Sequence, residues 1–210
     1  MLKRKGVPPA PERAKCGSSW RSFLKHHKGE ILACDFFTVE TAWLKTLYVL
    51  FFIELGSRRV YLSDCTSSPT SAWVTQQARQ LSWRLQDGAL PSHYLIHDRD
   101  AKFPRAFDTV FTSEDVAIIR TPVRAPNANA IAERWVRSVR EECLDRIVIL
   151  GEGHLRRVLT AYVDYYNHAR PHQGIEQQCP IRRENAVRDG PIERRDILDG
   201  VLRDYYRRAA

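Results

Sequence analysis

The chain has 210 residues, of which 43% are hydrophobic and 28% are charged, as is typical of a soluble globular protein with its own hydrophobic core. No apolar run is long enough to span a bilayer and no signal-peptide pattern follows Met1, so the sequence predicts a cytoplasmic protein without a membrane partner. The five cysteines are odd in number, widely spaced and without a C-x-x-C pair, which argues against a disulfide framework or a zinc ribbon.

The charge balance favours a polyanionic partner. Lys and Arg number 33 against 25 Asp and Glu, which gives a formal net charge of +8. The excess is concentrated near the start of the chain, where residues 1–30 hold eight Lys or Arg and two Glu. Phosphates gain from neutralisation by such groups, so nucleic acid is the simplest partner that the charge suggests.

Residues 1–29 are expected to be a basic lead-in with one short helix within 18–27. Three β-rich runs then follow, at residues 31–37, 44–55 and 58–65. Gly56 and Ser57 form a turn signal between the second and the third run. Because the links are short, the three runs predict an antiparallel meander.

Next in the chain, a helix is expected over residues 67–86, with Ser68 as its N-cap and Pro69 at its first position. A short apolar strand is expected after it at residues 93–97. A short helix around Pro104 then follows within 101–115, and a second short apolar strand at 116–120. Residues 121–130 have the composition of a loop.

Two further helices are expected at 129–145 and 152–167. The second of them carries apolar residues at i, i+3, i+4 and i+7: Leu155, Val158, Leu159, Tyr162, Val163 and Tyr166. A last helix is expected near residues 195–206, within a polar, Arg-rich end. The whole order describes an α/β protein with a mixed sheet and helices on its faces.

Three acidic residues stand in unusual settings. Asp35 interrupts an apolar strand, Asp98 directly follows a buried strand, and Glu133 lies in the first turns of a helix. Each has an ordinary explanation: a solvent-facing strand position, a helix cap, or a favourable charge at a helix N-terminus. A charge among large apolar neighbours is nevertheless costly unless something compensates it.

Convergence of these three acids would require a cation, and oxygen-only ligation suits Mg²⁺ or Mn²⁺. Two such ions are what phosphodiester cleavage uses, one for the attacking oxygen and one for the leaving oxygen. On the expected helix, Arg137 and Arg140 share a face with Glu133. This stripe is either an internal ion pair or a clamp for phosphates. Three apolar residues of the same helix face a core instead: Trp135, Val136 and Val139.

Three blocks of the sequence carry a resemblance to a known family. "IHDRDAKF" resembles the H-S-D-N-G-x-E-F block of bacterial insertion-sequence transposases and retroviral-type integrases. "PNANAIAERWVRSVREE" resembles their P-x-x-N-G-x-x-E-R block, and "YYNHARPHQGI" resembles their Y-N-x-x-R-P-H-x-x-L segment. The blocks lie in the expected order between about residues 30 and 180.

This resemblance implies an RNase H-like α/β fold, with a mixed five-stranded sheet and helices on both faces. It implies DNA strand cleavage and transfer by a D,D,E triad that holds two Mg²⁺ or Mn²⁺ ions: Asp35, Asp98 and Glu133. It also implies DNA contacts by four arginines: Arg99, Arg134, Arg137 and Arg140. Residues 1–29 would be an arm, 30–170 the catalytic core, and 171–210 an Arg-rich extension. DNA and further copies of the chain are the expected partners, at the nucleoid, without a small-molecule cofactor.

The sequence departs from the family pattern at two places. Asp98-Arg99-Asp100 replaces D-N-G, and Asn129-Ala130 replaces N-G. When the block is aligned with the family pattern backwards from Phe103, Asp98 falls at the position of the family's metal ligand. Asp100 is then expected to cap the next helix or to balance the charge of Arg99. Only a basic arm stands where the family usually has a helix-turn-helix segment. Two alternatives therefore stay open: a non-catalytic DNA-binding remnant, and an RNase H-like nuclease without strand transfer.

Overall fold

A computed structural model describes residues 22–24, 26–86, 93–121, 130–182 and 189–208. The expected lead-in lies largely outside these ranges, as does the expected loop at 122–129. Residues 22–24 and 26–27 are helical, and a 3-10 turn, Lys28–Glu30, follows them. None of the described helices is both long and apolar enough to cross a membrane.

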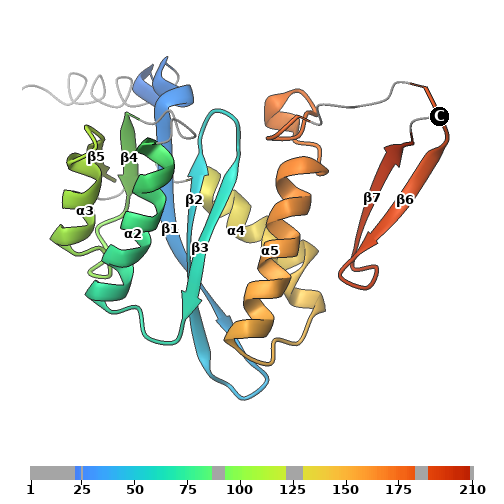
Figure 1. Ribbon diagram of the computed structural model, residues 1–210, viewed down its shortest axis with the longest axis horizontal. Helices are drawn as coiled ribbons and strands as arrows, with labels where there is room; N and C mark the ends of the chain where they lie inside the picture. The colour runs from blue at the N-terminus through green and yellow to red at the C-terminus, as the bar shows by residue number, and fades with distance from the viewer. Residues whose placement is uncertain (1–21, 25, 87–92, 122–129, 183–188, 209–210) are drawn as a thin grey trace, which may run out of the picture.

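The centre of the molecule is a five-stranded mixed sheet in the order β3-β2-β1-β4-β5 (Figure 1). Its strands are β1 (Ile31–Glu40), β2 (Thr46–Glu54), β3 (Val60–Thr66), β4 (Tyr94–His97) and β5 (Ala117–Arg120). The first three pair antiparallel, which confirms the predicted meander, whereas β4 pairs parallel to both β1 and β5. Short links suit the antiparallel pairs, and crossover helices supply the parallel ones.

Helices cover both faces of the sheet, as predicted (Figure 1). On one face lie α2 (Ser71–Gln86) and α3 (Arg105–Thr112), and on the other lie α4 (Ala130–Glu142) and α5 (Glu152–His168). Alternation along β1 divides the core, since Ala33 and Phe37 face α4 and α5 while Leu32 and Cys34 face α2 and α3. A 3-10 turn, Leu144–Arg146, links α4 towards α5.

The first turn of α2 differs from the prediction. The helix begins at Ser71, so Ser68 and Pro69 precede it. Thr70 takes the capping role instead, because its Oγ1 accepts a hydrogen bond from the Trp73 N–H at 3.2 Å. Both Ser and Thr make good caps, and local sequence alone does not decide between two of them so close together.

The helix predicted near residues 195–206 is wrong. This segment forms an antiparallel hairpin of β6 (Ile192–Ile197) and β7 (Leu202–Arg207), which stands beside α5 and away from the central sheet (Figure 1). Leu198, Asp199 and Gly200 all have positive φ in the connecting turn. The Asp-Gly pair is a hairpin signal that outweighs the helical spacing of the flanking apolar residues.

Asn167, in the "YYNHARPHQGI" block, joins α5 to β3. Its Oδ1 accepts from the N–H of Val60 at 2.9 Å, and its Nδ2 donates to the carbonyl of the same residue at 2.8 Å. The side chain thus occupies the place that a neighbouring strand would take. Asn167 is only 6% exposed, so these two hydrogen bonds have no ready replacement by water.

Replacing Asn167 with Ala should lower the free energy of unfolding by about 2–4 kcal/mol, because it leaves two buried backbone groups of Val60 without partners. Urea denaturation measures the change. Thr160→Ala, at an exposed position of the same helix, is the control and should shift stability by less than about 0.5 kcal/mol. Equal effects of the two substitutions would contradict the role given to Asn167.

Candidate active site

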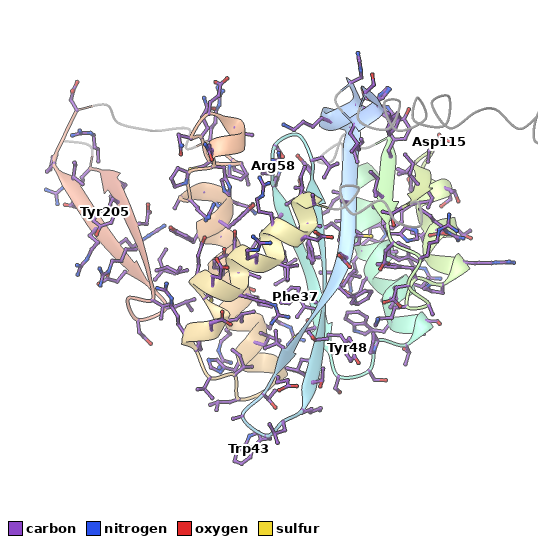
Figure 2. The ribbon with its side chains drawn as sticks, turned by 180° about the vertical axis from the view of Figure 1, so that it is seen from behind. Phe37, Trp43, Tyr48, Arg58, Asp115 and Tyr205 are labelled. Carbon is purple, nitrogen blue, oxygen red and sulfur yellow. The ribbon has the colours of Figure 1, made fainter. Side chains whose placement is uncertain are left out.

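Asp35 lies in the middle of β1, opposite Phe51 of β2. It follows Ala33 and precedes Phe37 in the alternation, so it belongs to the face of the sheet that α4 covers. Figure 2 shows Phe37 near the centre of this face. The sequence therefore places a half-buried carboxyl group at the inner side of the sheet, where a strand of this composition would normally carry an apolar residue.

The register between β1 and β4 brings Asp98 to the level of Asp35. The last pair of this parallel ladder is Ala33 with Ile96; two residues further on come Asp35, within β1, and Asp98, one residue past the end of β4. Neighbouring parallel strands keep equal steps, so Asp98 is expected near the level of Asp35, and its charge acts on Asp35. The pairing explains why residues that are distant in sequence belong to one site.

A buried histidine holds the chain at Asp98. The His97 side chain is 1% exposed; its Nδ1 lies 2.6 Å from the carbonyl oxygen of Asp98, and its Nε2 lies 2.9 Å from Oδ1 of Asp108. Both partners are acceptors, so the contacts with Asp98 and Asp108 fix the orientation of the ring. Arg120 completes the network with a 2.6 Å hydrogen bond to the other oxygen of Asp108.

Glu133 comes from the first turns of α4, on the side of the helix away from its buried stripe. That stripe, Ala132, Trp135 and Val139, packs on the sheet; of the residues expected to face the core, Trp135 and Val139 are buried, and Val136 is half-buried against the same core. Glu133 and Arg137 are exposed, as the predicted shared face requires. Arg140 instead reaches back to β1, where its Nη2 donates to the Thr38 carbonyl at 2.8 Å.

The two other arginines of the predicted DNA-binding set lie in different surroundings. Arg134 is exposed on α4, one residue after Glu133. Arg99 is also exposed, and its Nε donates to the Thr121 carbonyl at 3.3 Å. Arg99 thus bridges the segments that follow β4 and β5, next to Asp98.

The pKa of Asp35 reflects its burial and the charges near it. Its pKa is raised to about 6, chiefly because the carboxyl group is buried. The negative charges of Asp98, Glu133 and Asp100 raise it further. The N–H of Phe36 donates to Asp35 Oδ1 at 2.7 Å and acts in the opposite direction. Asp35 therefore feels the charges of both other acids of the predicted triad.

Within the described ranges, no three His, Cys, Asp or Glu side chains lie close enough together to hold a metal ion. The three carboxylates thus interact through their charges without forming a finished three-ligand group. Their oxygen-only donor set suits Mg²⁺ or Mn²⁺, and a nearby cation would favour ionisation of Asp35. Asp35, Asp98 and Glu133 are the residues that could hold such an ion.

Asp100 has a separate local role. Its two oxygens take the N–H and the ammonium group of Lys102, and its own N–H donates to Asp98 Oδ1 at 3.0 Å. Burial alone would raise the pKa of Asp100, but the hydrogen bonds from Lys102 lower it below the usual value. The partner of Asp100 is therefore Lys102 rather than Arg99, and it closes the turn before α3, whose N-cap position is Pro104.

Several residues of this region escaped the sequence reasoning. Lys102 pairs with Asp100 and lies 5.9 Å from the ring centroids of both Phe36 and Tyr48. Its place inside the "IHDRDAKF" block was the only available signal. Asp108 and Arg120 gave none, because only the packing of α3 and β5 beside β4 brings them to His97.

Comparison with known proteins agrees with this architecture. Residues 114–180 match the family model described as "Integrase core domain". The structure is similar to the HTLV-2 integrase catalytic core domain, solved in complex with magnesium in a dimeric form, with a TM-score of 0.50 at 16% identity over 70% of this chain and 92% of that one. No curated protein matches the sequence.

A second similar structure is a chain of the simian T-cell lymphotropic virus intasome, solved in complex with the PP2A regulatory subunit B56 gamma. Its TM-score is 0.58 at 11% identity, over 85% of this chain and 66% of that one. At such low identity these similarities concern the fold. They confirm the predicted RNase H-like architecture and the resemblance to integrase and transposase catalytic cores.

The raised pKa of Asp35 has a consequence for stability. An unfolded aspartate titrates near 3.9, whereas Asp35 titrates near 6 in the folded chain. Above pH 6 the group is ionised in both states and destabilises the folded one; below about pH 4 it is protonated in both and the penalty vanishes. Asp35→Asn should therefore raise the free energy of unfolding at pH 7.5 by roughly 1–3 kcal/mol in metal-free buffer.

Denaturant titrations at pH 7.5 and pH 5 test this expectation, and the gain at pH 5 should be about half as large. Glu40→Gln, at an exposed position of the same strand, is the control and should change stability by less than about 0.5 kcal/mol. An Asp35→Asn protein that is no more stable than the parent at pH 7.5 would show that the strand tolerates the charge without cost.

Proposed function

We propose that this chain, which has the RNase H-like fold of integrase catalytic cores, is the catalytic core of a DNA transposase or integrase. It would cleave a DNA strand and transfer the freed end to a target. The observation that carries the proposal is the placement of three acids from three elements: Asp35 within β1, Asp98 directly after the adjacent β4, and Glu133 at the beginning of α4, with the charges of the last two acting on Asp35. Such arrangements of carboxyl groups cluster at functional sites.

In this proposal Asp35, Asp98 and Glu133 hold two divalent cations, Mg²⁺ or Mn²⁺. When bound, such ions activate the attacking oxygen and neutralise charge on the leaving oxygen. The HTLV-2 integrase core is a similar fold solved with magnesium, which supports this choice. The role of the chain is to fix the carboxylates: β1 and β4 by their register, and Asp98 also through the buried His97 network.

The arginines would position the DNA. Arg137 is exposed on the same side of α4 as Glu133, which suits a contact with the phosphates next to the reacting bond. Arg140 is tied to β1 through Thr38, so its guanidinium has a defined direction. Arg99 is close in sequence to Asp98 and is likewise held, by the Thr121 carbonyl. Bidentate, always charged guanidinium groups are well suited to phosphate recognition.

We also propose that several copies act together on DNA, in the cytoplasm at the nucleoid. Joining two element ends to one target generally requires more than one active centre. Relatives in fold were solved as an intasome and as dimeric and trimeric forms of a catalytic core, which supports an assembly here. The net charge of +8 favours accumulation on DNA at moderate salt.

Cleavage should depend on all three acids. Asp35→Asn, Asp98→Asn and Glu133→Gln should each lower Mg²⁺-dependent nicking of DNA about a thousand-fold, because each removes a carboxylate that would hold the divalent ions. Asp100→Gly is the matched control, since Asp100 is engaged by Lys102, and it should keep the rate within about ten-fold. A gel-based nicking assay with a defined duplex gives these rates.

The outcome distinguishes the remaining readings. Cleavage that survives Asp35→Asn or Glu133→Gln would refute the triad. Cleavage lost on Asp100→Gly but kept on Asp98→Asn would reverse the assignment of the second acid. A chain that binds DNA but never nicks it under any of these conditions would be a non-catalytic DNA-binding protein.

Strand transfer requires its own experiment. A duplex that already ends in the recessed 3′ hydroxyl of an element end should become joined to a second, labelled DNA when the parent chain and Mg²⁺ are present. Joined product should disappear in Asp98→Asn. Efficient nicking without any joined product would instead identify a nuclease that lacks the transfer step.

A further inference from the structure

A second, separate feature is a cavity of about 300 Å³ on the other side of α4 from Glu133. We call it the arginine pocket. It is lined by Arg58 from the β2–β3 turn, Arg134 and Trp135 from α4, and Arg170, His172 and Gln173 after α5. Figure 2 shows Arg58 at the β2–β3 turn, next to α4. No Asp or Glu is among the described residues that line it.

One of the three arginines is neutralised. Arg170 donates to both oxygens of Glu142, at 2.6 Å from Nη2 and 2.9 Å from Nε. His172 supports it, because its Nδ1 lies 3.2 Å from Arg170 Nη1 while its Nε2 donates to the Tyr166 carbonyl at 3.2 Å. Burial chiefly lowers the pKa of His172; the hydrogen bond to the Tyr166 carbonyl opposes this shift, and the charges of Arg170 and Arg58 add to it. Arg170 and His172, which belong to the "YYNHARPHQGI" block, thus form one wall of the pocket.

The residues that the structure describes supply no such partner for the other two arginines. Within the described part of the chain, no hydrogen bond or ion pair reaches the guanidinium of Arg58 or of Arg134. Burial lowers the pKa of Arg58; the charge interaction with Tyr166 acts in the opposite direction, and the like charge of Arg134 adds to the lowering. Two like charges that approach each other without a counter-charge favour an anion between them.

Local geometry presents Arg58 to this pocket. It adopts φ +70°, in the left-handed region that a non-glycine residue rarely occupies. Its guanidinium lies flat against Gly174, where a Cβ would come within 3.4 Å of Nη2. A Cβ at this position would be in ordinary van der Waals contact with the guanidinium, so Gly174 marks a close approach of Arg58 to the segment after α5.

Trp135 adds an independent observation. Its side chain is 1% exposed and lines the pocket, and its Nε1 is the one buried side-chain nitrogen or oxygen in the described ranges that lacks a hydrogen-bond partner. An unmade hydrogen bond of a buried donor is costly. The amide of Gln173 and the hydroxyl of Ser138 can donate as well, so the pocket is rich in donors and lacks negative charge.

We propose that the arginine pocket binds a phosphate group of the DNA backbone, held by Arg58 and Arg134 at a position separate from the three acids. This inference rests on the proposed function in that the ligand is DNA. Glu133 and Arg134 are consecutive on α4 but point to different sides, so a DNA strand that engages both passes around the beginning of this helix. The pocket would then hold DNA on the side remote from the reaction.

Binding without metal tests the proposal apart from cleavage. Fluorescence anisotropy with a short DNA duplex, in EDTA, should give an affinity about ten-fold weaker for Arg58→Ala and for Arg134→Ala. The slope of log Kd against log salt concentration should also fall by about one for each. Arg58→Lys keeps the charge but not the fork of donors, and should give an intermediate loss.

Arg79→Ala is the matched control. Arg79 is exposed on α2, on the opposite face of the sheet, and its loss changes net charge by the same amount. It should weaken binding less than three-fold and leave the salt slope nearly unchanged. Equal effects of Arg79→Ala and Arg58→Ala would overturn the proposal, because then only net charge would matter.

Inorganic phosphate provides a direct probe of the pocket. In a ¹H–¹⁵N spectrum, the indole resonance that Trp135→Phe removes should shift on titration with phosphate at constant ionic strength, and should not shift in Arg58→Ala. Absence of a shift in the parent chain, together with unchanged DNA affinity of both arginine variants, would refute the site. If DNA affinity is unchanged but sedimentation shows that Arg58→Ala dissociates an oligomer, the pocket holds a carboxylate of a second copy, which likewise refutes it.

Failure of this inference differs from failure of the proposed function. If both arginine variants nick DNA normally and bind it with unchanged affinity, the proposed catalytic role stands and the proposed phosphate site is refuted. If the parent chain never nicks DNA but both variants bind DNA more weakly than it does, the proposed phosphate site stands and the proposed catalytic role is refuted. A parent chain that does not bind DNA at all would overturn both.

Discussion

The parallel pairing of β1 with β4 is the constraint on which the rest of the structure depends. It joins the antiparallel meander to the helix-linked strands, and its register carries Asp35 and Asp98 to one level of the sheet. A carboxyl group in the middle of β1 is unfavourable for folding, as the raised pKa of Asp35 indicates. Burial of the apolar residues on both faces of β1 stabilises the folded state and compensates for the cost of the half-buried Asp35 carboxyl group.

Helix α4 connects the two candidate sites. Trp135 packs against Phe51 with ring centroids 4.2 Å apart, and this contact fixes the rotation of the helix on the sheet. Once the rotation is fixed, helical periodicity decides which residue reaches which side: Glu133 is directed away from the buried stripe, and Arg134 towards the arginine pocket. A shift of one residue in this packing would bring Glu133 to the position of Arg134 and Arg134 to the buried position of Trp135.

Much of the fold could be predicted from the sequence, because apolar periodicity is a local property. The six apolar residues predicted for α5 are all buried, and the strand order of the meander follows from short links. The β6–β7 hairpin was missed since helical spacing and the Asp199-Gly200 turn signal compete there. The contacts of His97 with Asp108 and Arg120 were not predictable, because they depend on how separate elements pack. The unusual settings of Asp35, Asp98 and Glu133 in the sequence raised their convergence as a hypothesis, and the resemblance of the motifs then assigned them to one triad.

The hydrogen bonds of Asn167 have a consequence for how copies of the chain can meet. β3 is an outer strand of the sheet, and Asn167 takes both outward-facing backbone groups of Val60, its first residue. An outer strand with free backbone groups invites another chain to continue the sheet, which leads to uncontrolled association. By closing the beginning of β3, the helix removes this route there. Any contact between copies that involves the beginning of β3 must therefore use side-chain surfaces and not a continued sheet.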